Sequence, residues 1–232
     1  MIQKQHVIIQ MPINEKTTEW AFRNYPHLIQ TTYSDKRNQY LLLSRSLLQY
    51  CLKSFFDIDH LPAIQYLEHG KPYFPDHPTI SFNITHTDNT MAIIVANSSP
   101  VGIDIEIIKL RKNLQGLENR VLSQQEQNWL HQQSDYLQAF FTLWSAKEAY
   151  LKATGTGLSG LSGLELNLAN NLALGPLIGG YLYLRQNPIQ ESFAYYLPYA
   201  TEPNLYCFDG TKLQSIFGQW HTILCYNHHP EI

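Results

Sequence analysis

The sequence predicts an α+β fold built from two similar halves. A stretch with helical periodicity, about residues 35–53, is followed by several short apolar runs, and a second helical stretch, about 135–154, is followed by more. This segregation of helix from strands is typical of α+β proteins. A turn at 97–100 separates the two series. We therefore expect an N-terminal half, residues 1–100, and a C-terminal half, residues 101–232, each with a helix packed on a small, mostly antiparallel sheet.

The elements of the N-terminal half follow from periodicity and turn residues. The apolar run His6–Met11 predicts a first strand, and apolar residues recur three, four and seven apart along the helix at 35–53. Proline and glycine interrupt residues 62–78, which predicts a loop. Apolar residues alternate with polar ones over 80–84, as in a half-buried strand. The continuous apolar run Met91–Ala96 predicts a central strand.

Capping residues mark the helices of the C-terminal half. Ser123 followed by Glu126 forms a capping box that opens a short helix. Ser134 or Asp135 is expected to cap the longer second helix, and Gly155 stands where a C-cap glycine ends it. The strands of this half are expected at residues 101–107, 164–168, 181–184, 193–197 and 222–226.

Composition and charge argue against several classes of protein. The 232 residues carry a formal net charge of −3, so no overall basic field indicates a nucleic-acid partner. The longest apolar stretch, 172–184, is shorter than the roughly 20 residues that a membrane helix needs, and the N-terminus lacks the pattern of a signal peptide. Cys51, Cys207 and Cys225 are scattered and form neither a disulfide framework nor a metal knuckle. We expect a cytoplasmic protein without a nucleic-acid or membrane partner.

Two carboxylates lie on one face of the strand predicted at 101–107. Asp104 and Glu106 are two residues apart, so their side chains point to the same side of the strand. Carboxylates this close repel each other unless a cation or a base lies between them, and Mg²⁺ favours one or two carboxylates together with phosphates. The pair is therefore a candidate metal site. The alternative is an ordinary strand with a solvated acidic face.

A third carboxylate interrupts an apolar stripe of the second helix. Phe141, Trp144, Glu148 and Leu151 follow one another at spacings of three or four, which places them on one helical face. A carboxylate in such a stripe needs a partner. Lys152 lies four residues after Glu148, the spacing that ion pairs on solvated helices also use. Glu148 is thus a candidate metal ligand or base, with a surface ion pair to Lys152 as the alternative.

Positive side chains occur at further turns and element ends. Lys71 lies in the rigid turn Gly-Lys-Pro, and His86 ends the strand predicted around 80–84. Arg37 and Arg45 lie eight residues apart on the first helix, near one face. Taken alone, Lys71 fits a solvated turn and His86 a structural histidine. Read together with the carboxylates, these cations indicate a site for phosphates and a divalent metal ion.

Four motifs occur in a characteristic order along the middle of the chain. They are Gly-Lys-Pro at 70–72, Phe-Asn-x-Thr-His at 82–86, Gly-Ile-Asp-x-Glu at 102–106 and Trp-Ser-x-Lys-Glu-Ala-x-x-Lys at 144–152. Each motif alone is weak, whereas all four in this order are specific. The sequence resembles the surfactin-type 4′-phosphopantetheinyl transferases. Its length also suits the monomeric members of that family, whose two halves form a pseudo-dimer.

The resemblance implies a reaction, a cofactor and partners. Such enzymes act as holo-[acyl-carrier-protein] synthases: they transfer the 4′-phosphopantetheine group of coenzyme A to a serine of an apo acyl, peptidyl or aryl carrier protein. They need Mg²⁺, release adenosine 3′,5′-bisphosphate, and serve fatty acid, polyketide or nonribosomal peptide biosynthesis. A non-catalytic coenzyme A or carrier-protein binding module of the same fold is the alternative. A magnesium-dependent nuclease would require clustered aromatic and basic groups, which the sequence lacks.

The resemblance also implies roles for individual residues. The metal ligands would be Asp104, Glu106 and Glu148. Glu148 would also be the base for the carrier serine, and Lys152 would neutralise the diphosphate as it breaks. Contacts to coenzyme A would come from Lys71, Thr85, His86, Lys36, Arg37 and Arg45.

Two departures from the family pattern and one basic segment complete these expectations. Thr85 stands where serine is commoner and keeps the hydroxyl group. Residues 26–34 lack the lysines of some relatives, so Lys36, Arg37 and Arg45 are expected to replace them.

Because carrier proteins of this kind are acidic, a local basic patch is expected to dock them, with a solvated loop as the alternative. The patch comprises Lys109, Arg111, Lys112 and Arg120.

Overall fold

The computed structural model describes residues 5–29, 35–177, 179–185 and 190–226, which form two compact units. Each unit is described by itself. Unit 1 comprises Met1–Tyr66, Pro72–Ser99 and Glu202–Phe217, and unit 2 comprises Leu67–Lys71, Pro100–Thr201 and Gly218–Ile232. The main change of unit falls at Ser99–Pro100. The later segment Glu202–Phe217 belongs to unit 1, and the earlier segment Leu67–Lys71 belongs to unit 2.

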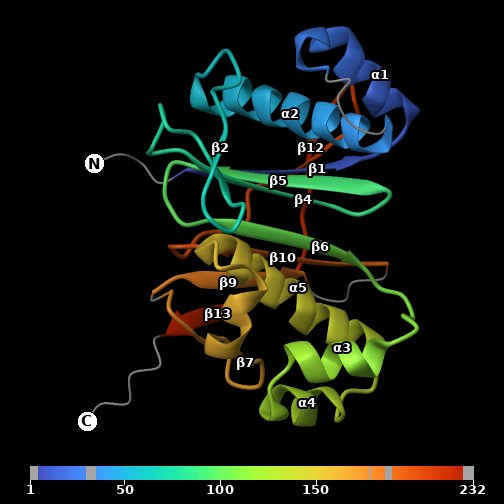
Figure 1. Cartoon of the computed structure of the whole chain (residues 1–232), viewed down its shortest axis with the longest axis vertical. Helices are drawn as coiled ribbons and strands as arrows, with labels where there is room; N and C mark the ends of the chain where they lie inside the picture. The colour runs from blue at the N-terminus through green and yellow to red at the C-terminus, as the bar shows by residue number, and fades with distance from the viewer. Residues whose placement is uncertain (1–4, 30–34, 178, 186–189, 227–232) are drawn as a thin grey trace. The chain divides into compact units, whose positions relative to one another are not determined.

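Unit 1 is a five-stranded sheet with the helix α2 (Asp35–Phe56) along one face (Figure 1). The strand order is β12-β11-β1-β5-β4, and all neighbours are antiparallel except β1 and β11. A small ribbon of β2 (Gln65–Tyr66) and β3 (Pro72–Tyr73) and a short 3₁₀ turn, Pro26–Leu28, accompany the sheet. The remaining elements are β1 (His6–Pro12), α1 (Glu15–Asn24), β4 (Ser81–His86), β5 (Thr90–Ala96), β11 (Leu205–Phe208) and β12 (Leu213–Ser215).

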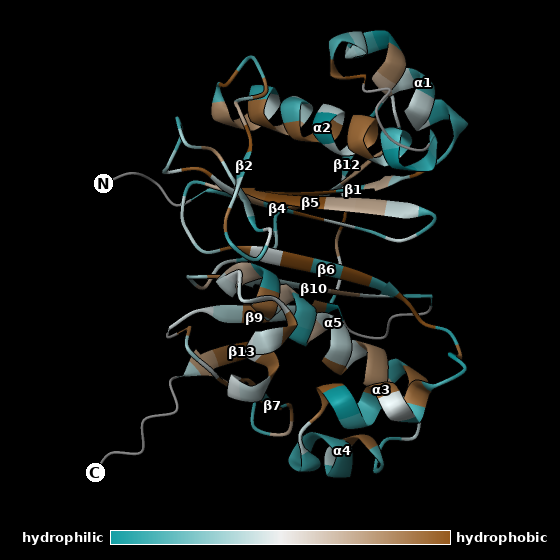
Figure 2. Cartoon of the chain, viewed as in Figure 1, coloured by the Kyte–Doolittle hydropathy of each residue, from teal (hydrophilic) through white to brown (hydrophobic). Residues whose placement is uncertain are grey.

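The core of unit 1 lies between α2 and the sheet. Leu43 and Leu47 of α2 belong to one buried cluster with Val7 and Ile9 of β1 and Ile93 of β5. The central strand β5 is almost wholly buried and is mainly hydrophobic in Figure 2. This burial fits its continuous apolar run, because a strand whose successive side chains are all buried needs no polar side.

Unit 2 is a six-stranded sheet whose covering helix is α5 (Tyr136–Thr154). The strand order is β6-β10-β9-β13-β8-β7, and all neighbours are antiparallel except β13 and β8. The helices before and after α5 are α3 (Leu114–Val121), α4 (Gln124–Leu130) and the 3₁₀ segment η2 (Gly157–Gly163). The strands are β6 (Gly102–Ile107), β7 (Glu165–Asn167), β8 (Leu172–Leu174), β9 (Tyr181–Arg185), β10 (Glu191–Leu197) and β13 (Trp220–Tyr226).

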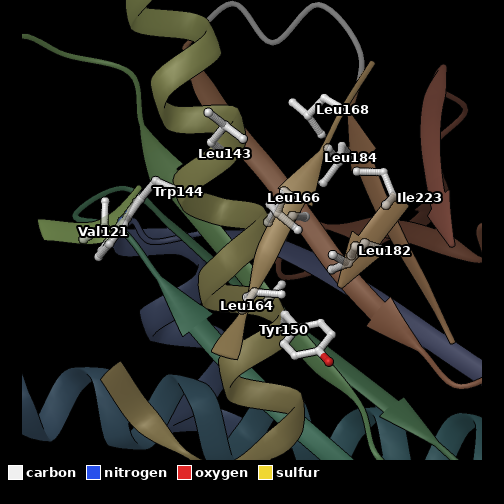
Figure 3. Close-up of a cluster of buried hydrophobic side chains, with 14 of the residues drawn as sticks. Val121, Leu143, Trp144, Tyr150, Leu164, Leu166, Leu168, Leu182, Leu184 and Ile223 are labelled. Carbon is white, nitrogen blue, oxygen red and sulfur yellow. The ribbon is translucent and has the colours of Figure 1, made fainter. Parts of the chain in front are cut away.

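The capping signals of unit 2 are confirmed. Ser123 and Glu126 form the reciprocal capping box of α4. Asp135 is the N-cap of α5 and accepts from the N–H of Gln138, and Gly155 is its left-handed C-cap at φ +73°. The α5 helix then packs on the sheet. Figure 3 shows part of that cluster, with Leu143 and Tyr150 of α5 and sheet residues such as Leu182 and Ile223.

The α+β class is confirmed, and the two units share part of their topology. In unit 1 the strand β1 is followed by α2 and the hairpin β4–β5, which lie in the order β1-β5-β4. In unit 2 the strand β6 is followed by α5 and then β9 and β10, which lie in the order β6-β10-β9. Within the described ranges, no helix combines the length and apolarity that crossing a bilayer requires.

Candidate functional site

The candidate site is built where β6 crosses α5 in unit 2. Ile103 and Ile105 are buried on one face of β6, so Gly102, Asp104 and Glu106 share the other face, which lies against α5. A Cβ atom added at Gly102 would lie 2.0 Å from the carbonyl oxygen of Ala149. Glycine is therefore required for the helix and the strand to approach this closely.

Asp104 is the most buried carboxylate of this face, with 3% of the residue exposed. Its Oδ1 accepts a hydrogen bond from Nζ of Lys152 at 2.6 Å. Burying a carboxylate is costly unless a charge or donors compensate it. The ammonium group of Lys152, in the last turn of α5, supplies that compensation.

Glu106 is held by donors at both carboxylate oxygens. Oε1 accepts from Nε1 of Trp144 at 2.7 Å, and Oε2 accepts from Nη2 of Arg111 at 2.8 Å. The guanidinium of Arg111 also lies 5.1 Å from the ring centre of Phe141. Burial raises the pKa of Glu106 and the nearby charge of Asp104 raises it further, while the two donors lower it.

Glu148 lies half-buried on α5, one turn from Trp144 and one turn from Lys152. Burial raises the pKa of Glu148, and the charges of Asp104 and Glu106 act in the same direction, while Lys152 lowers it. The carboxylate thus interacts electrostatically with the other two acids. Phe141, Trp144 and Leu151 are buried, so Glu148 does interrupt an apolar stripe.

The donor chemistry of β6 fits magnesium, although the described residues do not by themselves form a complete set of metal ligands. Asp104 and Glu106 offer hard oxygen atoms on one face, and Mg²⁺ needs only one or two carboxylates when phosphates and waters complete its shell. Among the described residues, no group of three or more His, Cys, Asp or Glu is arranged to hold a metal ion. The three-ligand set with Glu148 stays a prediction.

The side chain of Lys71 also reaches the β6–α5 crossing, where its ammonium group contacts backbone carbonyls. Its Nζ donates to the carbonyl oxygens of Lys152 at 2.9 Å, of Val101 at 3.1 Å, and of Ala153. Burial lowers the pKa of Lys71 to about 8, so most of the population remains charged at neutral pH. The sequence did not predict these three contacts.

The β6–α5 crossing lies inside a segment with recognisable relatives. Residues 100–198 match the family model of the 4′-phosphopantetheinyl transferase superfamily. Asp104, Glu106, Glu148 and Lys152 all fall within the match. The chain is therefore similar to that superfamily over the part that carries the carboxylates.

Several curated relatives are named 4′-phosphopantetheinyl transferases. The chain is 36% identical over 97 residues to the 4′-phosphopantetheinyl transferase AcpT of Salmonella typhimurium, covering 41% of this chain and 50% of the relative. It is 32% identical over 133 residues to AcpT of Escherichia coli K12, covering 56% and 65%. It is 40% identical over 97 residues to a 4′-phosphopantetheinyl transferase of Bacillus subtilis, covering 40% and 41%. The chain spans about half the length of curated relatives that it matches.

The remaining candidate contacts to coenzyme A lie in unit 1, outside the segment that the superfamily model matches. His86, at the end of β4, stacks on Tyr40 of α2 with ring centres 4.3 Å apart. Lys36 lies 5.6 Å from the same ring and pairs with Asp88 at 2.9 Å, which raises the pKa of Lys36. Thr85 is buried in β4. Arg37 is exposed near the start of α2, and Arg45 lies two turns further along it.

Sequence reasoning missed residues whose roles depend on distant partners. The sequence pattern predicts Trp144 only as part of an apolar stripe and Arg111 only as part of a docking patch, yet both donate to Glu106. Lys147, inside the Trp-Ser-x-Lys motif, forms a buried ion pair with Glu126 at 2.7 Å and donates to the carbonyl oxygen of Leu164. Lys147 therefore fastens α5 to α4 and to the start of β7.

Proposed function

We propose that this protein is a surfactin-type 4′-phosphopantetheinyl transferase. It transfers the 4′-phosphopantetheine group of coenzyme A to a serine hydroxyl of an apo carrier protein and releases adenosine 3′,5′-bisphosphate. The observation that carries the proposal is the β6–α5 crossing, where Asp104, Glu106, Glu148 and Lys152 lie within the superfamily match. The similarity of the relatives supports the same reaction.

The residues of this crossing divide the chemistry between them. Burial raises the pKa of Glu148, which makes its carboxylate a stronger base and the candidate acceptor for the proton of the carrier serine. The serine oxygen then forms its bond to the phosphorus next to pantetheine, while that phosphorus loses its bond to the bridging oxygen of the diphosphate, which leaves as part of the 5′-phosphate of adenosine 3′,5′-bisphosphate. Lys152 would place a compact positive charge beside the negative charge that the 5′-phosphate of the leaving nucleotide gains. Magnesium bound by Asp104 and Glu106 would neutralise the diphosphate.

Unit 1 would supply the contacts to coenzyme A. His86, Lys36 and Arg37 lie at or near the N-terminal end of α2, where positive charge suits a phosphate. Arg45 and Thr85 are retained as candidate contacts. The shared strand–helix–hairpin order of the two units supports a monomer with pseudo-dimeric halves. The three free cysteines support a reducing, cytoplasmic setting.

The carrier protein would dock on the segment after β6. Lys109 and Lys112 are exposed, and Leu110 between them is 82% exposed. Arg120 is also exposed, whereas Arg111 turns back to Glu106. Positive charges around one exposed apolar side chain suit an acidic partner that also offers an apolar contact.

One experiment tests the function and its alternative together. The purified protein is incubated with coenzyme A, Mg²⁺ and a panel of apo acyl, peptidyl and aryl carrier proteins, and intact mass reports the gain of one phosphopantetheinyl group. We expect transfer to at least one carrier, abolished by a chelator and restored by added Mg²⁺. Binding of coenzyme A and carrier without any transfer would instead support the non-catalytic binding module. Absence of both transfer and binding would refute the proposal.

A further inference from the structure

Lys71 lies at the end of a rigid turn in unit 2. The N–H of Gly70 donates to the carbonyl of Leu67 at 2.8 Å, and the N–H of Leu67 donates to the carbonyl of Lys71 at 2.9 Å. Gly70 has φ +81°, a conformation that glycine adopts without strain. Pro72 restricts the backbone of Lys71 to extended conformations. The side chain therefore starts from a well-defined position.

The stem of Lys71 runs past the end of α5. A Cβ atom added at Gly155 would lie 3.1 Å from Cδ and 3.3 Å from Cβ of Lys71. Gly155 is the left-handed C-cap of α5, so glycine is needed there both for its backbone conformation and for room. Because the C-cap residue Gly155 has no side chain, the stem of Lys71 fits beside the end of α5.

The ammonium group of Lys71 caps α5. The last four carbonyls of a helix lack partners within it, and positive charge is favourable near them. Nζ donates to two of these carbonyls, those of Lys152 and Ala153, and to Val101, which directly precedes β6. An ammonium group has three donors, and these three acceptors use them all. A phosphate would have to displace them.

These contacts fasten together the two backbone segments that carry Asp104 and Lys152. Val101 lies three residues before Asp104, and the capped carbonyl of Lys152 belongs to the residue whose side chain binds Asp104. Gly102 forms the close contact with α5 beside them. We propose that Lys71 is a positioning residue that fixes Lys152 against Asp104, and that it is not a phosphate ligand for coenzyme A. Its kinetic consequences rest on the proposed transferase function, whereas its effect on folding does not.

The test compares Lys71→Met, which keeps the stem and removes the charge, with Lys71→Arg and the unit 1 variant Lys36→Met. For Lys71→Met we expect a lower Tm and a kcat reduced by about 10- to 100-fold, because the site is misplaced. The KM for coenzyme A should stay within about twofold of wild type, because the substitution removes no contact that binds coenzyme A. Lys71→Arg should regain part of both losses. Lys36→Met, at a proposed coenzyme A contact, should raise the KM instead.

Several outcomes would overturn the assignment. A Lys71→Met protein with an unchanged Tm, an unchanged kcat and a KM for coenzyme A raised tenfold or so would make Lys71 a phosphate ligand. If Lys71→Met does not fold, Gly155→Ala strains the same contact: reduced kcat with normal KM supports the proposal, and unchanged kcat contradicts it. If wild type transfers to no carrier, the proposed function fails separately, and the Tm of Lys71→Met and its recovery in Lys71→Arg still decide the capping role.

Discussion

The crossing of α2 with β1 and the crossing of α5 with β6 follow one plan with different chemistry. In both units a strand leads to a long helix and pairs with the second strand of the hairpin that follows. On β1 the residues that face the helix are apolar, including Val7 and Ile9. On β6 they are Gly102, Asp104 and Glu106. The same architecture therefore serves as plain core in one unit and as a polar site in the other.

The difference shows what a site of this kind requires from its surroundings. Unit 1 joins helix and sheet by burying apolar surface, which needs no particular partner for each side chain. Unit 2 also buries apolar surface between α5 and the sheet, but at β6 it adds contacts between single donors and single acceptors, Lys152 to Asp104 and Trp144 to Glu106. Such contacts depend on the positions of both partners, and a buried carboxylate that loses its donor lowers the stability of the fold. The large apolar cluster on the rest of α5 and the Lys147–Glu126 pair stabilise the helix that carries them.

The largest expected effect is on kcat, and it should follow a substitution at the β6–α5 crossing but not one at the β1–α2 crossing. Glu148→Gln should reduce kcat by about 10³-fold, because loss of a positioned base typically costs 10²- to 10⁴-fold. Ile9→Val, on the corresponding face of β1, is the control: it should cost only about 1 kcal/mol of stability and leave kcat near wild type. Intact-mass time courses with an apo carrier measure both. Near-normal kcat in a folded Glu148→Gln protein would remove the base role.

The next effect concerns stability in unit 2. Lys152→Met removes the ammonium group that Asp104 accepts from, and we expect a loss of about 2–3 kcal/mol, less than for a fully buried pair because 28% of the Lys152 side chain is exposed. Adding Asp104→Asn should restore part of the loss. Urea unfolding of both single variants and the double variant gives the coupling energy. Additive losses would mean that the pair contributes nothing to folding.

A titratable group in the core of unit 1 should make that unit sensitive to acid. Burial lowers the pKa of His6 to about 4, whereas an unfolded histidine has a pKa near 6.5. Between these values the unfolded state binds more protons, so stability falls as the pH falls. From pH 7 to 4.5 we expect wild type to lose about 2 kcal/mol more than His6→Gln. Parallel pH profiles of unfolding for the two proteins would contradict this.

The smallest expected effect concerns docking. Reversing the charges of Lys109 and Lys112 should raise the KM for carrier protein by about tenfold and leave the KM for coenzyme A unchanged. Arg111→Glu should instead lower kcat, because Arg111 binds Glu106. Lys53→Glu, an exposed charge reversal in unit 1, is the matched control. Equal effects of the Lys109/Lys112 and Lys53 changes on carrier KM would argue against docking at this segment.

Patterns between near neighbours in the chain predicted much of the fold. The capping box of Ser123 and Glu126, the C-cap Gly155 and the alternation of β6 each depend on residues a few positions apart, and each is confirmed. The helix α1, the pairing of β11 beside β1 and the contacts of Arg111 were not predicted. The pairing of β11 with β1 and the contacts of Arg111 depend on which segments meet after folding.

The amino-acid sequence by itself determined the α+β class, the four motifs and the placing of Asp104 and Glu106 on one side of a strand, because side-chain direction in a strand follows from position alone. Only the tertiary structure decided that Lys152 holds Asp104, that Trp144 and Arg111 hold Glu106, and that Lys71 caps α5. Those partners come from separate elements. Their meeting depends on how closely β6 and α5 pack, which no local pattern encodes.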